Sequence, residues 1–159
     1  MKILALDQAL QTTGWAVFDN QQLIAHDTFT IPATKPIEQR LGMIWDQLTD
    51  LYYQHEFKYV IFEDIQNQNN NQTYCKLAYV QAAIMLWCYF NDMKFTIYPP
   101  THWRSLIGGS WGKKREEQKA HAIELVKQKY NVNCSSDAAD AICIGYAYLQ
   151  EKKNKIITF

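Results

Sequence analysis

The chain has 159 residues, of which 48% are apolar and 20% charged, and its formal net charge is zero. A chain of this length is expected to form one domain, residues 1–159, and a net charge of zero gives no general attraction to nucleic acid. The sequence shows no apolar run long enough to cross a bilayer, no secretory signal and no CxxC cysteine spacing, which predicts a cytoplasmic protein with reduced thiols.

The first half of the chain is expected to begin with three strands, at residues 2–7, 13–18 and 23–31. Short connections with turn residues join them, which indicates an antiparallel meander. A helix follows from Pro36, because apolar residues recur at spacings of three and four up to Leu51. The unbroken apolar run at residues 59–62 then predicts a strand that is covered on both faces.

The second half is expected to hold one further strand among several helices. After the polar stretch Gln66–Gln72, the pattern predicts a helix at 73–90, a strand at 95–98, and helices at 102–107, 115–130 and 137–151. Ser135 and Ser136 can cap the last helix. The order βββ-α-β-α-β-α-α predicts a mixed α/β sheet with helices on both faces, in which strand ends gather at one edge.

Acidic residues stand at that edge in three separate elements. Asp7 follows the first strand, and Asp137 and Asp140 lie three apart at the start of the last helix, where they share a face. Alone, Asp7 is typical of a loop or capping residue, and Asp137 is favoured near a helix N-terminus by about 0.3–1 kcal/mol. Glu63 and Asp64 end the fourth strand, and at most one of them can join the cluster, because neighbouring strand residues point to opposite faces. The apolar pattern does not choose between them.

Converging carboxylates need a positive partner, because each one raises the pKa of its neighbours. No cation adjoins these four positions in the sequence. A divalent ion meets the need, and all-oxygen ligands favour Mg²⁺ or Mn²⁺ over Zn²⁺. The sequence therefore predicts a divalent-metal site at one edge of the sheet.

Three segments, ILALDQALQTTGWAVF, VIFED and SSDAADAICIGYAY, resemble the acidic motifs of RuvC-type Holliday junction resolvases, which belong to the ribonuclease H/integrase-like nuclease superfamily. The resemblance covers nearly the whole chain in order and spacing. It implies a five-stranded mixed sheet of strand order 3-2-1-4-5 with helices on both faces. It also implies four residues that are catalytic and bind metal, namely Asp7, Glu63, Asp137 and Asp140.

The activity implied by the resemblance is that of a crossover junction endodeoxyribonuclease. Two Mg²⁺ ions per active site, replaceable by Mn²⁺, would support phosphodiester hydrolysis, with Asp7 shared between them. A homodimer joined through the helix at residues 72–90 would nick opposed strands of four-way or branched DNA symmetrically, leaving 5′-phosphate and 3′-hydroxyl ends. The small size and relaxed motifs suit a phage-encoded member that acts in the cytoplasm of the host cell. Neither a nucleotide cofactor nor a membrane is implied.

The chain departs from the family pattern at two places. Gln8 and Ala9 stand where relatives often have Pro-Gly after the first Asp, so the turn must form differently. Gln66 stands where bacterial relatives tend to have an aromatic residue near the crossover bases. This second departure predicts a weaker preference for the DNA sequence at the cleavage point.

A basic segment is expected to bind the DNA backbone. Residues 94–130 carry 8 Lys and Arg against 3 Asp and Glu, whereas residues 1–93 carry 5 against 10. Such a segment is either a solvated helix face or a phosphate-binding surface. Trp103 and Trp111 lie within it and can stack on bases or serve the core or a hinge. The expected DNA-binding residues are Gln66, Arg104, Lys113, Lys114, Arg115 and Lys119.

Three other functions fit parts of the pattern. An ATPase of the actin or sugar-kinase type needs a second lobe and another phosphate loop, for which 159 residues leave no room. A ribonuclease H-type nuclease acting on RNA–DNA hybrid is disfavoured by the placement of Glu63 on a strand and of Asp137 and Asp140 on the last helix. A junction-binding protein that has lost catalysis is disfavoured because all four acids are present.

Overall fold

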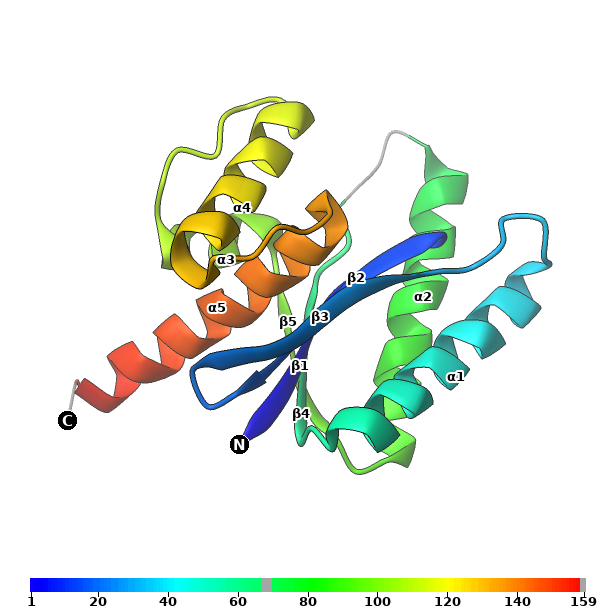
Figure 1. Cartoon of the computed structure of the whole chain (residues 1–159). Helices are drawn as coiled ribbons and strands as arrows, with labels where there is room; N and C mark the ends of the chain where they lie inside the picture. Colours follow the sequence, from blue (N-terminus) through cyan, green and yellow to red (C-terminus); the bar gives the residue numbers. More distant parts are fainter. Residues whose placement is uncertain (67–69, 158–159) are drawn as a thin grey trace.

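The computed structural model describes residues 1–66 and 70–157, and these ranges contain a five-stranded sheet of order β3-β2-β1-β4-β5 (Figure 1). The strands are β1 (Lys2–Asp7), β2 (Thr12–Asp19), β3 (Gln22–Thr30), β4 (Tyr59–Glu63) and β5 (Lys94–Tyr98). β1 runs antiparallel to β2 and parallel to β4, and β4 runs parallel to β5. The predicted fold class and strand order are confirmed.

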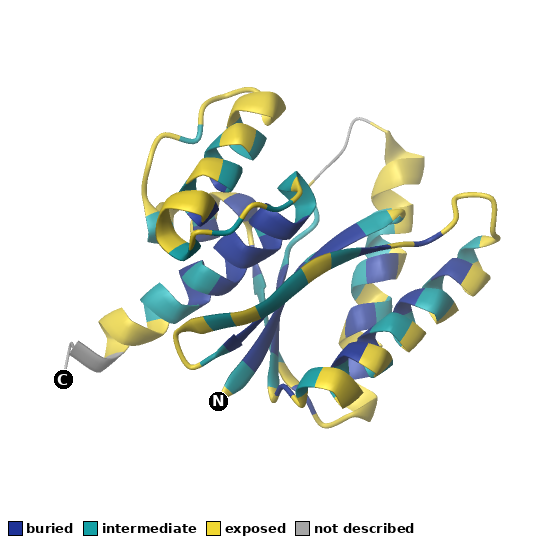
Figure 2. Ribbon diagram, viewed as in Figure 1, coloured by how far each residue is buried: buried dark blue, intermediate teal, exposed yellow. Residues whose placement is uncertain are grey.

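Helices cover both faces of the sheet (Figure 1). On one face lie α1 (Ile37–His55) and α2 (Asn71–Phe90), and on the other lie α3 (Pro100–Ile107), α4 (Arg115–Tyr130) and α5 (Ser136–Ile157). This explains the unbroken apolar run of β1, since Ile3 and Ala5 pack on the α5 side while Leu4 and Leu6 pack on the α1–α2 side. Figure 2 shows the central strand buried between the two layers.

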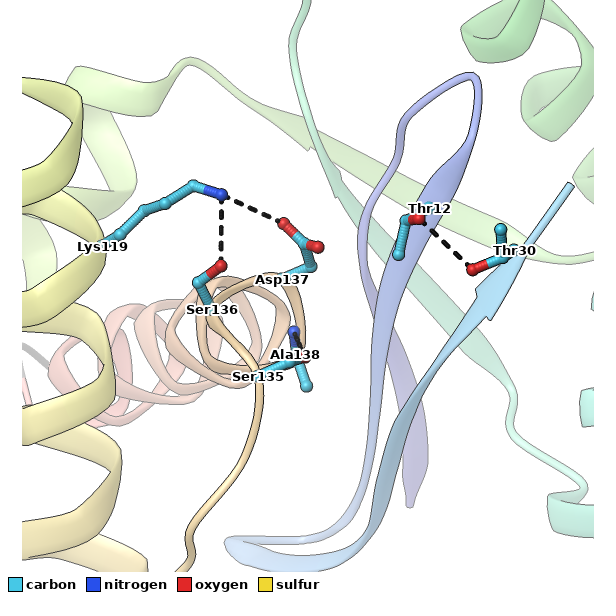
Figure 3. A network of polar contacts seen from close by, with 7 residues as sticks. All are labelled: Thr12, Thr30, Lys119, Ser135, Ser136, Asp137 and Ala138. Atoms are coloured by element: carbon cyan, nitrogen blue, oxygen red, sulfur yellow. Dashed lines mark hydrogen bonds and ion pairs between the residues drawn. The ribbon is translucent and has the colours of Figure 1, made fainter. Parts of the chain in front are cut away.

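The last helix begins as predicted but ends later. The Ser135 hydroxyl accepts a hydrogen bond from the Ala138 N–H at 3.2 Å and so caps α5 (Figure 3). The expected end near Glu151 was wrong, because α5 continues to Ile157. Apolar periodicity stops before this last part, but its lysines are good helix formers, and Lys155 pairs with Glu151 at 3.0 Å.

Two other helices begin two residues earlier than predicted. α2 starts at Asn71 because the Asn70 side chain accepts hydrogen bonds from the N–H groups of Gln72 and Thr73. α3 starts at Pro100, a residue that is well tolerated in the first turn of a helix. Residues 67–69 of the predicted polar stretch lie outside the described residues. Within the described ranges, no helix is long and apolar enough to cross a membrane.

Two glycines allow α5 to lie directly on β1 and β2. A Cβ atom at Gly145 would come within 2.3 Å of the Phe18 ring, and one at Gly14 would come within 1.9 Å of the backbone oxygen of Asp137. A side chain at Gly14 would require the backbone of α5 to move, and one at Gly145 would require the buried Phe18 ring to shift. Gly14 is also the β2 residue that pairs with Asp7. The start of α5 is therefore held against the end of β1.

Replacing Gly14 with Ala is expected to lower the free energy of unfolding by about 1–3 kcal/mol, because the new methyl group would overlap the Asp137 backbone. Urea unfolding measures the change. Gly42→Ala is the matched control, since Gly42 lies inside α1 with nothing within 4 Å of its Cβ position. The control is expected to gain about 0.5–1 kcal/mol. Unfolding at several protein concentrations distinguishes a change in folding stability from a change in self-association. Equal stability of the two variants would contradict the close approach of the Asp137 backbone to Gly14.

Candidate active site

Four carboxylates from three elements lie at one edge of the sheet. Asp7 ends β1 and Glu63 ends β4, and because these strands are adjacent and parallel, their ends meet. Asp137 and Asp140 lie at the start of α5, which rests on Gly14, the β2 partner of Asp7. The charges of the other three carboxylates all act on Asp7. The structure thus brings together the four residues expected from the acidic motifs.

Glu63 and Asp64 make contacts with different elements, as expected for neighbours at a strand end. The Glu63 side chain accepts a hydrogen bond from Trp103 Nε1 at 2.6 Å, and its charge acts on Asp140. Asp64 Oδ1 instead accepts from Gln81 Nε2 at 3.2 Å and from the Ile65 N–H at 2.9 Å. Asp64 is therefore tied to α2, and Glu63 is the β4 carboxylate that joins the cluster.

The cluster holds more negative charge than its surroundings compensate. Burial, followed by the charges of Asp140 and Glu63, raises the pKa of Asp7 well above its usual range. Burial and then the charge of Glu63 raise the pKa of Asp140 to about 7. Burial also raises the pKa of Glu63, although the Trp103 hydrogen bond and the Arg104 charge oppose the rise. These shifts show a site that favours added positive charge.

Lys119 supplies one positive charge directly to the cluster. Its Nζ lies 3.4 Å from Asp137 Oδ1 and 3.1 Å from Ser136 Oγ, so that α4 is joined to the start of α5 (Figure 3). Lys119 is among the residues expected to bind the DNA backbone, and its contact with an acidic residue was not predicted from the sequence. The sequence around Lys119 gave no signal of a contact with Asp137, because the two residues are far apart in the chain and on different helices.

Arg104 supplies a second charge from α3. It lowers the pKa of both Glu63 and Asp140, yet in the described part of the chain it forms no ion pair within 4 Å. Its guanidinium lies over the ring of Trp103, at 4.9 Å from the centroid, and 5.5 Å from that of Trp111. The other expected DNA-binding residues, Gln66, Lys113, Lys114 and Arg115, are exposed and make no side-chain contact with the four carboxylates among the described residues.

Gln8 forms the turn after β1 in its own way. Its buried side-chain amide donates to the backbone oxygen of Glu63, which ties the ends of β1 and β4 together. Thr13 supports the same turn, because its hydroxyl and the backbone of Ala9 exchange hydrogen bonds at 3.2 Å. Sequence reasoning noted Gln8 only as a departure from the family pattern and missed this contact.

The donor set fits a divalent ion. All four side chains are carboxylates, and once ionised their four negative charges would exceed the two positive charges of Lys119 and Arg104. Among the described residues, no three acidic, His or Cys side chains converge tightly enough to form a ready-made metal site. One oxygen of two of these carboxylates has a protein partner, since Glu63 Oε2 bonds to Trp103 and Asp137 Oδ1 pairs with Lys119. The other oxygen of each of these carboxylates makes no hydrogen bond within the described ranges.

Comparison with known proteins identifies similar chains. A family model described as crossover junction endodeoxyribonuclease RuvC matches residues 3–148. The RuvC protein of Halorhodospira halophila is 24% identical over 154 residues, which cover 95% of this chain and 91% of that protein. The RuvC protein of Rickettsia africae is 28% identical over 156 residues, which cover 96% of this chain and 99% of that protein.

Solved structures share the fold. Thermus thermophilus RuvC in complex with a Holliday junction substrate matches with a TM-score of 0.78 and 14% identity, covering 97% of this chain and 96% of that one. Fowlpox virus resolvase, in complex with Holliday junction DNA, matches with a TM-score of 0.69 and 18% identity, covering 96% of this chain and 99% of that one. At these identities the likeness shows the fold alone.

Replacing Asp7 with Asn is expected to stabilise the metal-free protein above neutral pH, because one charge leaves a crowded cluster. The raised pKa values mean that the folded protein holds these protons more tightly than the unfolded chain does. The repulsion therefore grows as the pH rises from about 4, the ordinary carboxyl pKa, through about 7. At about pH 8 the Tm should exceed that of wild type by several degrees, since about 1 kcal/mol moves Tm by about 2–4 °C.

Asp64→Asn is the matched control, because Asp64 is bonded to α2 and lies outside the cluster. Its Tm should gain less on wild type than that of Asp7→Asn as the pH rises, because the charge of Asp64 is the smallest of the influences on Glu63. Added Mn²⁺ should then raise the Tm of wild type more than that of Asp7→Asn. An Asp7→Asn protein no more stable than wild type at any pH would show that the carboxylates do not repel one another.

Proposed function

The chain belongs to the RuvC family of crossover junction endodeoxyribonucleases, and we propose that Asp7, Glu63, Asp137 and Asp140 form the metal-dependent site with which it cuts Holliday junctions. One observation carries the assignment: four carboxylates from β1, β4 and α5 meet in a partly buried cluster with too little positive charge. Nucleases of this family depend on divalent metal. The ions we assign to this site are two Mg²⁺, for which Mn²⁺ can substitute.

The arrangement of the side chains supports a two-metal mechanism. Two bound divalent ions would supply an activated water and stabilise the leaving 3′ oxygen. Asp7 experiences the charge of all three other carboxylates, so we assign it to both ions, with Glu63, Asp137 and Asp140 completing the ligand sets. Hydrolysis in which the 3′ oxygen leaves would produce a 5′-phosphate and a 3′-hydroxyl.

Positive side chains around the site would bind the DNA backbone. Arg104 is the cation nearest to the cluster without an ion-pair partner in the described ranges, which suits it to bind the phosphate that is cut. Lys119 already contacts Asp137 and would balance charge at the same place. Lys113, Lys114 and Arg115 precede or begin α4 and are exposed, so they would bind neighbouring phosphates and make affinity depend on salt. Gln66, exposed after β4, would face the DNA near the crossover.

The second partner we propose is another copy of this chain. α2 buries one side against the sheet, yet on its other side Tyr79, Leu86, Tyr89 and Phe90 are between 50% and 75% exposed. An apolar groove between α1 and α2 continues this surface and is lined by Leu41, Gly42, Trp45, Tyr79, Ala82, Ala83 and Leu86. Contiguous exposed apolar surface marks an interaction site. A two-fold homodimer joined here would offer two active sites to a junction with two opposed strands.

The place of action we propose is the cytoplasm. All four cysteines are free thiols in the structure, and Cys88 and Cys143 are buried. Such thiols persist where the compartment is reducing.

A panel of DNA substrates tests the proposed activity. The purified protein should cut a synthetic four-way junction in Mg²⁺, and the comparison includes flaps, forks, linear duplex and RNA–DNA hybrid. Asp7→Asn should bind the junction without cutting it, because the phosphate-binding cations remain. Cutting of the hybrid alone would instead indicate a ribonuclease H-type enzyme, and junction binding without cutting by the wild-type protein would indicate an inactive binder.

A matched pair of variants tests the ligand assignment on β4. Glu63→Gln should abolish cutting, whereas Asp64→Asn should retain most of it, because Asp64 contacts α2 rather than the cluster. Cleavage rates on the four-way junction give the answer. Loss of cutting in Asp64→Asn together with normal cutting in Glu63→Gln would reverse the assignment.

Replacing Leu86 with Glu is expected to convert the dimer to a monomer, because it places a charge on the apolar surface of α2. Analytical ultracentrifugation measures the change. Ile24→Glu is the control: Ile24 is 45% exposed on β3 and should leave the dimer intact. A wild-type protein that is monomeric at all concentrations would rule out this partner.

A further inference from the structure

Trp103 contacts the acidic cluster through an uncharged group. Its side chain is fully buried, and its Nε1–H donates to Glu63 Oε2 at 2.6 Å. Within the described ranges the Glu63 side chain makes no other hydrogen bond. Trp103 is therefore the group that holds one carboxylate oxygen of Glu63 in place and leaves the other oxygen free.

The same tryptophan also holds Arg104. The guanidinium carbon of Arg104 lies 4.9 Å from the Trp103 ring centroid and 5.5 Å from that of Trp111. These two rings meet edge to face, with centroids 5.0 Å apart and an angle of 84°. The Nε atom of Arg104 is buried without a hydrogen-bond partner. In the described structure, ring contacts rather than ion pairs keep this cation beside the cluster.

Trp111 connects this arrangement to α4. Its Nε1–H donates to the Gly108 carbonyl at 3.0 Å, and its ring meets that of His121 at 4.6 Å between centroids. Gly109 passes so close to His121 that a Cβ atom there would lie 2.6 Å from Nε2. The loop after α3 is thus packed on α4, and Trp111 closes one side of the space that Arg104 occupies.

We propose that Trp103 is a positioning residue for the cutting reaction, orienting Glu63 towards the divalent ion and Arg104 towards the phosphate. The proposal rests on the assignment of Glu63 as a metal ligand. Its physical basis is that a partly buried carboxylate with a single hydrogen bond loses its orientation, as well as its only protein donor, when that bond is removed. One side chain then couples a metal ligand on β4 with a phosphate-binding residue on α3.

Trp87 is a buried tryptophan with a structural role alone and serves as the comparison for Trp103. It is also fully buried, and its Nε1–H donates to Thr49 Oγ1 at 3.0 Å. It packs on the opposite face of the sheet, away from the carboxylates. Replacing either tryptophan with Phe removes one donor and part of one buried ring, so the two changes should cost similar stability. Only the Trp103 change should alter metal binding.

The experiment compares Trp103→Phe with Trp87→Phe in the full chain. Mn²⁺ binding is measured by the rise in Tm without DNA, and the Mg²⁺ concentration for half-maximal junction cutting is measured separately. Trp103→Phe should need about ten- to a hundredfold more metal in both assays, the range seen when a partner of a ligand is removed. Trp87→Phe should need the same metal concentration as wild type. Equal metal dependence of the two variants would overturn the proposal.

Glu63→Gln in the same Mn²⁺ assay distinguishes an error in the metal-site assignment from an error in the role proposed for Trp103. If Glu63→Gln binds Mn²⁺ as wild type does, the proposed metal site is wrong and the role of Trp103 falls with it. If Glu63→Gln loses binding while Trp103→Phe keeps it, the site stands and only the positioning role is wrong.

A measurement on the unmutated tryptophan covers the case in which Trp103→Phe does not fold. The indole N–H resonances of ¹⁵N-labelled protein report on the hydrogen bond directly, and the other four tryptophans can be assigned through their own variants. Added Mg²⁺ should shift the indole N–H resonance of Trp103 more than that of Trp87. The substitution Glu63→Gln should shift the Trp103 resonance by more than added Mg²⁺ does. A Trp103 signal that responds to neither change would also overturn the proposal.

Discussion

The close approach of α5 to the sheet is the constraint on which the rest of the site depends. At Gly14 the backbone of Asp137 occupies the place of a side chain, and at Gly145 the ring of Phe18 does so. A helix carried on larger residues would stand further from β1 and β2. Its acidic residues would then lie too far from Asp7 for four carboxylates to share one space. The glycines at the contact between α5 and the sheet thus determine how closely the four carboxylates approach one another.

The crowding of carboxylates destabilises the metal-free protein, but it also favours the metal ions that the reaction needs. Desolvation raises the pKa of Asp7, Glu63 and Asp140, and repulsion from the other cluster carboxylates adds to the rise at Asp7 and Asp140, which destabilises the charged cluster. The fold limits this cost by bringing Lys119 from α4 and Arg104 from α3 to the same place. The remaining negative charge favours metal ions. Destabilising repulsion of this kind, within a fold whose other residues favour stability, is common at sites where function rather than stability determines the residues.

The turn after β1 shows how a departure from a family pattern can be compensated. Gln8 and Ala9 stand where the motif resemblance led us to expect Pro-Gly, and the sequence alone suggested only that the turn must differ. In the structure the Gln8 amide bonds to the backbone of Glu63, and Thr13 supports Ala9 from β2. Side-chain hydrogen bonds therefore join the strand ends that carry two of the four carboxylates.

The sequence by itself determined the strands, most helix boundaries and the mixed α/β class, because apolar periodicity, turn residues and capping residues are local signals, whereas the sheet order came from the motif resemblance. Together with the motif resemblance, it also singled out the four acidic positions. Tertiary structure supplied the contacts that separate Glu63 from Asp64, since both faces of β4 are apolar and its sequence pattern alone does not choose between them. It likewise decided the places of Lys119, Arg104 and Trp103. Each depends on contacts between segments far apart in the chain, which no local pattern encodes.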